Sequence, residues 1–236
     1  MFDFLKPKKT FADYGLLKGA TDNHSHILWG VDDGVRTLEE TLSILVFYES
    51  LGLKTLWLTP HTMEDVPNTT EGLTLRFSEL QEIYHGPIEL RLASEYMIDN
   101  LFEQRLEERD LMTHGHDTVL VETSTWAPPI DLWEILERMM SYGYRPMIAH
   151  PERYRYMTRK DYERLHEMGT VLQLNLPSII GSYGEEVRLK AQMLLDKGFY
   201  KMVGSDCHRS RAIQRQYSDI RIKESTLEQL KELMLA

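Results

Sequence analysis

Short apolar runs alternate with longer amphipathic stretches from about residue 20 onward. The apolar runs are rich in β-branched and aromatic residues, which is typical of buried strands. The seven expected strands end near His26, Thr59, Glu95, Glu122, Ala149, Asn175 and Gly204. Between them, apolar positions recur at helical spacing, and helices are expected at residues 38–51, 70–84, 132–142, 161–168, 185–197 and 227–235.

Seven strands that alternate with helices predict an α/β protein with a parallel core. A closed barrel is expected, and a doubly wound open sheet is the competing architecture. Residues 1–20 precede the alternating part and are expected to form an N-terminal arm, whereas residues 21–236 are expected to form one domain. Because both architectures bind ligands at the carboxyl ends of their strands, polar residues at those ends are the first functional candidates.

Residues that can ligate a metal follow nearly every expected strand. His24 and His26 stand two positions apart on the first strand, so they project from one face. The later candidates are Asp33, His61, Glu95, Glu122, His150, Asp206 and His208. Each alone has an ordinary structural explanation, such as an acid at a helix start or a histidine in a turn. Their recurrence at one end of the fold predicts a shared metal centre.

The chemistry of this set indicates catalysis on a phosphate ester. Imidazole and carboxylate without thiolate suit Mn, Fe or Zn in a multinuclear catalytic site better than structural zinc. Arg153 and Arg211 follow two of the candidate ligands, and guanidinium groups bind phosphate oxygens bidentately. Arg209 and Arg215 compete with Arg211 for the second position, and solvated surface arginines are the simpler alternative.

A cysteine phosphatase mechanism is excluded by the sequence. That mechanism requires an arginine six residues after the nucleophile, whereas Ile213 stands six residues after Cys207, the single cysteine. No phosphate-binding glycine loop and no dinucleotide fingerprint is present. A second His-x-His pair, His114 and His116, precedes an expected strand and is predicted to lie in a solvent-exposed loop.

Composition narrows the class of protein further. The net charge of -10 disfavours nucleic-acid binding, although bound cations would reverse the potential locally. No stretch approaches the ~20 apolar residues of a membrane span, and the first residues contain no secretory pattern. A single cysteine is typical of a reducing compartment, so a cytoplasmic location is expected.

Several motifs together resemble the polymerase and histidinol phosphatase (PHP) superfamily, and within it the bacterial CpsB/YwqE-type tyrosine-protein phosphatases. The motifs are His24-Ser-His26, Val31-Asp-Asp33-Gly34, Pro60-His61, Ser94-Glu95, Val121-Glu122, Ala149-His150-Pro-Glu-Arg153 and Ser205-Asp206-Cys-His208. The resemblance implies a distorted TIM-like barrel of about seven βα units and three divalent ions, usually manganese. It also implies action on phosphotyrosines in the tail of a bacterial tyrosine kinase that governs capsule or exopolysaccharide export.

The resemblance further implies how the ligands divide. One set is His24, His26, Glu95 and Asp206. Glu95 bridges to a second set, which Glu122 and His150 complete. The third set is Asp33, His61 and His208. Arg153 matches the substrate-binding arginine of the superfamily.

Three alternatives remain open at this point. A PHP-type enzyme could act on a small phosphomonoester such as histidinol phosphate. A metal-dependent amidohydrolase also begins with His-x-His, but usually adds a lysine carbamate, where this chain offers Glu95 and Glu122. A non-catalytic binding module would be expected to have lost ligands, whereas all nine positions here carry competent residues. Oligomeric state is left open.

Overall fold

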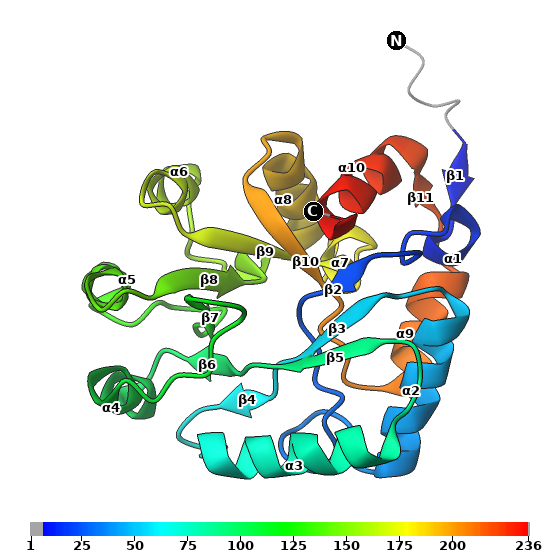
Figure 1. Cartoon of the computed structure of the whole chain (residues 1–236). Helices are drawn as coiled ribbons and strands as arrows, with labels where there is room; N and C mark the ends of the chain where they lie inside the picture. Colours follow the sequence, from blue (N-terminus) through cyan, green and yellow to red (C-terminus); the bar gives the residue numbers. More distant parts are fainter. Residues whose placement is uncertain (1–6, 236) are drawn as a thin grey trace.

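Nine parallel strand segments, which combine into seven strands, form the inner ring of the protein. Helices pack around the outside of this ring (Figure 1). The computed structural model describes residues 7–235. One parallel sheet has the order β10-β9-β8-β7-β6-β4 and the other the order β2-β3-β5. The strands of the ring are β2 (Thr21–Asp22), β3 (Thr55–Leu58), β4 (His61–Thr62), β5 (Glu89–Leu92), β6 (Glu95–Met97), β7 (Thr118–Glu122), β8 (Arg145–Ala149), β9 (Val171–Asn175) and β10 (Tyr200–Gly204).

Backbone hydrogen bonds join the two sheets into one barrel. Two expected strands are each interrupted, so that β3 continues as β4 beyond Pro60 and β5 continues as β6. Across these interruptions the pairing persists, because Ala93 N–H donates to Leu58 O and Glu95 N–H donates to Pro60 O. The fold is therefore the expected distorted barrel of seven βα units, and the open-sheet alternative is wrong.

The first and last strands of the ring close the barrel. Asn23 N–H donates to Val203 O (3.1 Å), Asp206 N–H to His24 O (2.8 Å) and His26 N–H to Cys207 O (3.0 Å). The buried Asp22 braces this seam, since its carboxylate accepts hydrogen bonds from Ser205 N–H and from the Tyr48 hydroxyl. The seam joins distant parts of the chain: Asn23 and Val203, which are hydrogen-bonded across it, are 180 residues apart in the sequence.

Alternation along the strands separates an inner from an outer apolar cluster. On β7, Val119 and Val121 belong to the large cluster that includes the helices, whereas Leu120 belongs to a small cluster with Met147 and Val171. Because successive side chains point to opposite faces, the small cluster fills the barrel interior. Glu122 has the same parity as Leu120, so its side chain also faces inward, above this apolar filling.

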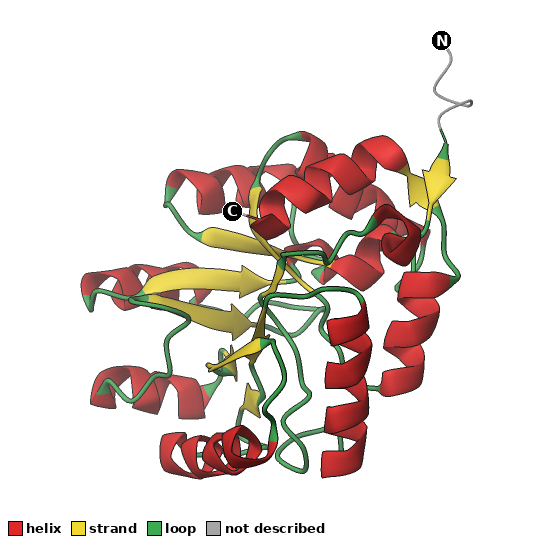
Figure 2. Ribbon diagram, turned by 45° about the vertical axis from the view of Figure 1, so that its right-hand side comes forward, coloured by secondary structure: helices red, strands yellow, loops and turns green. Residues whose placement is uncertain are grey.

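Helices follow most strands and cover the ring on its outer side (Figure 2). Threonine and aspartate side chains begin several of them: Thr37, Thr69 and Asp99 each accept a hydrogen bond from a backbone N–H of the first turn. The helices are α1 (Phe11–Tyr14), α2 (Leu38–Ser50), α3 (Thr70–Ile83), α4 (Asn100–Glu108), α5 (Leu132–Ser141), α6 (Arg159–Glu167), α7 (Leu176–Ile179), α8 (Glu185–Asp196), α9 (Ser210–Ser218) and α10 (Glu224–Leu235). A short 3₁₀ helix, η2 (Pro151–Arg153), follows β8.

The segment expected as an arm is packed onto the barrel over its described part; residues 1–6 lie outside the described residues. β1 (Lys8–Lys9) pairs antiparallel with β11 (Ile222–Lys223), near the C-terminal end of the chain. Phe11 is buried, with its ring edge-on to Tyr217 at 5.2 Å between centroids. Burial of the Phe11 ring stabilises the contact between this segment and the barrel. The strand pairing and the buried ring together place residues 8–20 within the folded unit.

Among the described residues, no helix is both long enough and apolar enough to cross a membrane.

Candidate metal centre

The nine candidate ligands meet at the carboxyl-end rim of the barrel. Three overlapping groups of their side-chain atoms are each close enough to hold one ion: His24, His26 and Asp206; His61, Glu95 and Glu122; and His26, Asp33, His61 and His208. His150 adjoins the second group, with Nε2 at 3.0 Å from Glu95 Oε1 and 3.6 Å from Glu122 Oε2.

The first group is fully buried beneath the rim. His24 Nε2 and His26 Nε2 lie 2.9 Å apart, and each lies within 3.2 Å of Glu95 Oε2. Asp206 Oδ1 is 3.4 Å from His26 Nε2 and 3.6 Å from His24 Nε2. Asp206 has a positive φ of 53°, a strained conformation that brings its backbone to the seam and its carboxylate to the histidines.

Glu95 occupies the middle of the centre. Its Oε2 also lies 3.2 Å from His61 Nδ1, while Oε1 faces His150. Because its two oxygens face different histidines, Glu95 is placed as a carboxylate shared between neighbouring ions would be.

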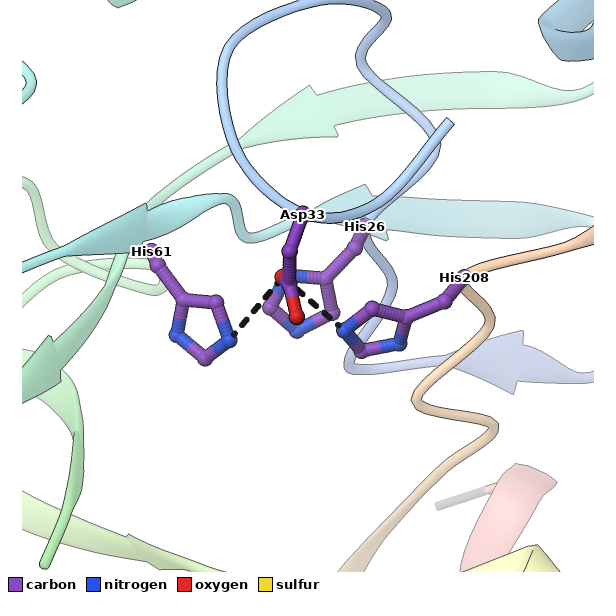
Figure 3. Close-up of side chains that lie close together, drawn as sticks. All are labelled: His26, Asp33, His61 and His208. Atoms are coloured by element: carbon purple, nitrogen blue, oxygen red, sulfur yellow. Dashed lines mark ion pairs between the residues drawn. The ribbon is translucent and has the colours of Figure 1, made fainter. Parts of the chain in front are cut away.

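The third group is the most accessible to solvent. Asp33 Oδ1 lies 3.4 Å from His208 Nε2 and 3.7 Å from His61 Nε2, and Figure 3 shows Asp33 between these two rings with His26 beside them. His61 therefore presents Nδ1 to Glu95 and Glu122 and Nε2 to Asp33. The resemblance assigned His61 to the third set alone, whereas the geometry places its ring between two groups.

The spacing of these atoms fits ligation by divalent cations. Two donor atoms bound at about 2.1 Å to one ion and at right angles lie about 3.0 Å apart, close to the spacing seen here. Two buried atoms, His61 Nδ1 and Glu95 Oε1, make no hydrogen bond with any described residue although carboxylate or imidazole atoms lie 3.0–3.2 Å away. A cation between these atoms would satisfy them, so the residues present fit the metals that the resemblance implies.

Charges in the metal-free centre balance one another. Burial opposes the imidazolium form of His24, but the carboxylates of Glu95 and Asp206 outweigh it and raise its pKa to about 9. Burial likewise opposes ionisation of Glu95, yet His24 and His61 hold its pKa well below the ordinary value. A hydrogen bond from His208 lowers the pKa of Asp33 to about 2. A cation that binds here would therefore have to displace a proton from His24.

Supporting side chains fix the ligands, and sequence reasoning missed them. Asp32 accepts from His26 Nδ1 at 2.8 Å and from the backbone N–H groups of His61 and Gly34. Gln173 Oε1 lies 2.9 Å from His24 Nδ1, which directs Nε2 toward the centre. The sequence did contain an indication of Gln173, because it is a polar residue at an inward position of an otherwise apolar strand. For Asp32 the indication was its place beside Asp33.

An open cavity of about 340 Å³ lies over the ligands. Arg153 lines it, donating to Asp206 Oδ2 at 3.1 Å while its guanidinium lies 4.5 Å from the centre of the Tyr183 ring. Arg209 also lines it, and donates to the backbone oxygens of Gly34 and His208. Arg211 is exposed on α9 and is absent from the cavity lining among the described residues. Arg209, and not Arg211, therefore lines the same cavity as Arg153.

The surroundings of His114 and Cys207 test two further expectations from the sequence. His114 was expected in an exposed loop, but it is buried with its ring stacked 3.6 Å from that of Trp57, and burial lowers its pKa to about 3. That expectation is wrong for His114, because its backbone pairs with Thr118 at the start of β7, with Gly115 at φ 80° in the turn between them. Cys207 is buried too, which raises its pKa to about 12, so it is not a thiolate nucleophile.

Fold and site together define a parallel barrel with a candidate multinuclear metal centre. The chain belongs to the family described as capsular polysaccharide synthesis, CpsB/CapC, whose model matches residues 20–226. This confirms the family resemblance that the sequence motifs indicated.

Several characterised proteins are similar to this chain. The tyrosine-protein phosphatase CpsB of Streptococcus pneumoniae is 27% identical over 232 residues, covering 91% of this chain and 94% of its own. The tyrosine-protein phosphatase YwqE of Bacillus subtilis is 26% identical over 195 residues, covering 79% and 76%. A crystal structure from work on these two proteins, described there as unique metal-dependent tyrosine phosphatases, has a TM-score of 0.72 at 23% identity. It covers 91% of this chain and 94% of that one, and it supports the fold.

Proposed function

We propose that this chain is a metal-dependent tyrosine-protein phosphatase. The observation that carries the proposal is the convergence of nine imidazole and carboxylate side chains beneath a cavity that two arginines also line. Its relatives in the same family are named tyrosine-protein phosphatases, which favours phosphotyrosine over histidinol phosphate. The complete ligand set argues against a non-catalytic module.

The proposed centre holds three divalent ions, with Mn²⁺ the first choice and Fe or Zn the alternatives. The ligands are His24, His26, Asp33, His61, Glu95, Glu122, His150, Asp206 and His208. When bound, such ions supply Lewis acidity toward phosphate oxygens and toward water.

The chain's own side chains orient the ester. Asp206 and Tyr183 hold the Arg153 guanidinium over the cavity, where its remaining N–H groups can bind phosphate oxygens as charge accumulates on them. Arg209, anchored at two backbone oxygens, is proposed as the second phosphate-binding arginine in place of Arg211. Because the leaving phenolate has a reference pKa of ~10, hydrolysis can proceed without a strong proton donor.

The proposed physiological substrate is the phosphotyrosine-bearing tail of a bacterial tyrosine kinase that controls capsule or exopolysaccharide synthesis in the cytoplasm. Family membership and the names of the relatives support this setting. No part of the site indicates nucleic acid as a partner.

The test combines elemental analysis with turnover. Purified protein is expected to contain close to three divalent ions per chain and to hydrolyse phosphotyrosyl peptide with a higher kcat/KM than histidinol phosphate. A chelator should abolish both activities, and Mn²⁺ should restore them. Full peptide hydrolysis by metal-free protein, or a preference for histidinol phosphate, would overturn the proposal.

A further inference from the structure

An arginine stacked on an exposed tryptophan lies at the same rim as the metal centre. The guanidinium of Arg155 lies 3.9 Å from the centre of the Trp126 ring. Trp126 is 68% exposed, and Arg155 is exposed as well. Neither residue lines the cavity over the ligands, so neither is part of the site described above.

Three hydrogen bonds fix this stack to the loops that carry the candidate ligands. Arg155 N–H donates to Thr125 O at 2.9 Å, and Thr123 N–H donates to the Tyr154 hydroxyl at 3.2 Å. The Thr123 hydroxyl also bonds to the Tyr156 hydroxyl. One loop follows Glu122 directly and the other follows Arg153, so the stack has a fixed position relative to both residues.

The Arg155 guanidinium is oriented but unpaired. Among residues 7–235 it makes no ion pair and no side-chain hydrogen bond, and its one side-chain contact is the stack on Trp126. Arg164 provides the contrast, since it stacks on Trp133 at 4.1 Å but also pairs with Glu137 at 3.6 Å. Stacking on an aromatic face restricts a guanidinium without using its N–H donors, which leaves Arg155 able to bind an anion at a small entropic cost.

We propose that the Arg155–Trp126 stack binds an acidic side chain that flanks the phosphotyrosine in a peptide substrate, and so contributes to specificity; this rests on the proposed phosphatase function. A peptide whose phosphotyrosine enters the cavity must run across the rim, where these two loops lie. On a chain with a net charge of -10, a local unpaired guanidinium is what an acidic peptide requires in order to dock.

The experiment compares kcat/KM for phosphotyrosyl peptides that carry Glu or Gln at each flanking position in turn. At one or two positions the wild-type enzyme should prefer Glu by roughly two- to fivefold, as expected for one solvent-accessible charge pair, and the preference should fall with added salt. Arg155→Gln should abolish the preference, and Trp126→Ala should weaken it. Hydrolysis of p-nitrophenyl phosphate should be unchanged in both variants, and the control Arg164→Gln should retain the preference.

Three results would overturn the inference. Equal rates on Glu and Gln peptides with the wild-type enzyme would remove it while leaving the phosphatase function intact. A preference that survives Arg155→Gln would assign it to another residue. Loss of the preference in the control Arg164→Gln as well would show a general effect of surface charge instead of a contact with Arg155. If no phosphotyrosyl peptide were hydrolysed at all, the phosphatase function itself would fail.

Discussion

Ligand orientation in this centre depends on residues that touch no metal-binding atom. Asp32 and Gln173 each contact the Nδ1 atom of a histidine whose Nε2 faces the centre. Such partners fix the ring orientation and the tautomer, and their loss typically reduces metal affinity or activity 10–100-fold, which is roughly the range expected here.

Substitution Asp32→Asn tests this dependence. We expect metal affinity to fall roughly 10–100-fold, because the amide no longer stabilises His26 with a negative charge. Competition titration with a chelating dye measures the affinity. Asp65→Asn, which alters an exposed aspartate in the same part of the sequence, serves as the control. Equal affinities for the two variants would contradict a role for Asp32.

The raised pKa of His24 predicts how pH acts on the metal-free protein. This histidine gains a proton more readily in the fold than in the unfolded chain, whose ordinary value is 6.5, with a folded pKa of about 9. Its stabilising contribution is therefore complete below about pH 6.5 and is lost as the pH rises toward 9. Metal binding has the opposite dependence, because the proton must leave first, so affinity should increase over the same interval.

Urea unfolding of chelator-treated protein and metal titration, both across this pH range, check the two slopes. An affinity that is independent of pH between 6.5 and 9 would show that His24 is neutral before metal binds.

At the scale of elements, close approach at the seam restricts one glycine. A Cβ on Gly204, at the end of β10, would lie 2.4 Å from His24 Cβ and 2.7 Å from Gln173 Nε2. His24 and Gln173 are hydrogen-bonded to each other, so any side chain added at position 204 must displace both of them.

Gly204→Ala is expected to destabilise the fold by about 1–3 kcal/mol through overpacking and to lower metal content. Thermal unfolding and elemental analysis measure the two effects. Gly72→Ala, within helix α3, is the matched control and should leave metal content unchanged. Normal metal content in Gly204→Ala would show that His24 can shift without loss of its ion.

Sequence patterns predicted elements well where the apolar runs were continuous. Strands β7 to β10 end at Glu122, Ala149, Asn175 and Gly204, as expected, because buried residues precede each of these ends. Helices α4 and α9 were not predicted. Helix α9 buries only Ile213 and Tyr217, and α4 carries charged residues at four of its nine positions, so apolar residues are few in both helices.

The candidate ligands could be proposed from sequence because imidazole and carboxylate recur at strand ends. Their partners could not, since a hydrogen bond such as that of Gln173 with His24 depends on packing across 149 positions. The choice between Arg209 and Arg211 likewise needed the direction of α9. The sequence shows which residue types recur at strand ends, whereas tertiary packing decides which of these residues lie in contact.

On the scale of the whole molecule, bound cations should raise stability. The nine candidate ligands come from several strand ends and lie together only in the folded chain, so ions that bind this state and not the unfolded one would stabilise it by mass action. At ion concentrations about 1,000 times the dissociation constant the gain is about 4 kcal/mol. Calorimetry with Mn²⁺ and with a chelator should show a higher Tm with the ion. An unchanged Tm would indicate that no tight site forms.

The closing seam of the barrel has a consequence for how activity relates to assembly. His24 and Asp206 supply backbone atoms that hold the first strand against the last, and their side chains belong to the same ion-binding group. Residues about 180 positions apart in the sequence must therefore meet before the catalytic site exists. A nascent or truncated chain that lacks its final strand would have neither a complete ring nor a complete ligand set. Hydrolysis of substrate would therefore be detected only after folding of the barrel is complete.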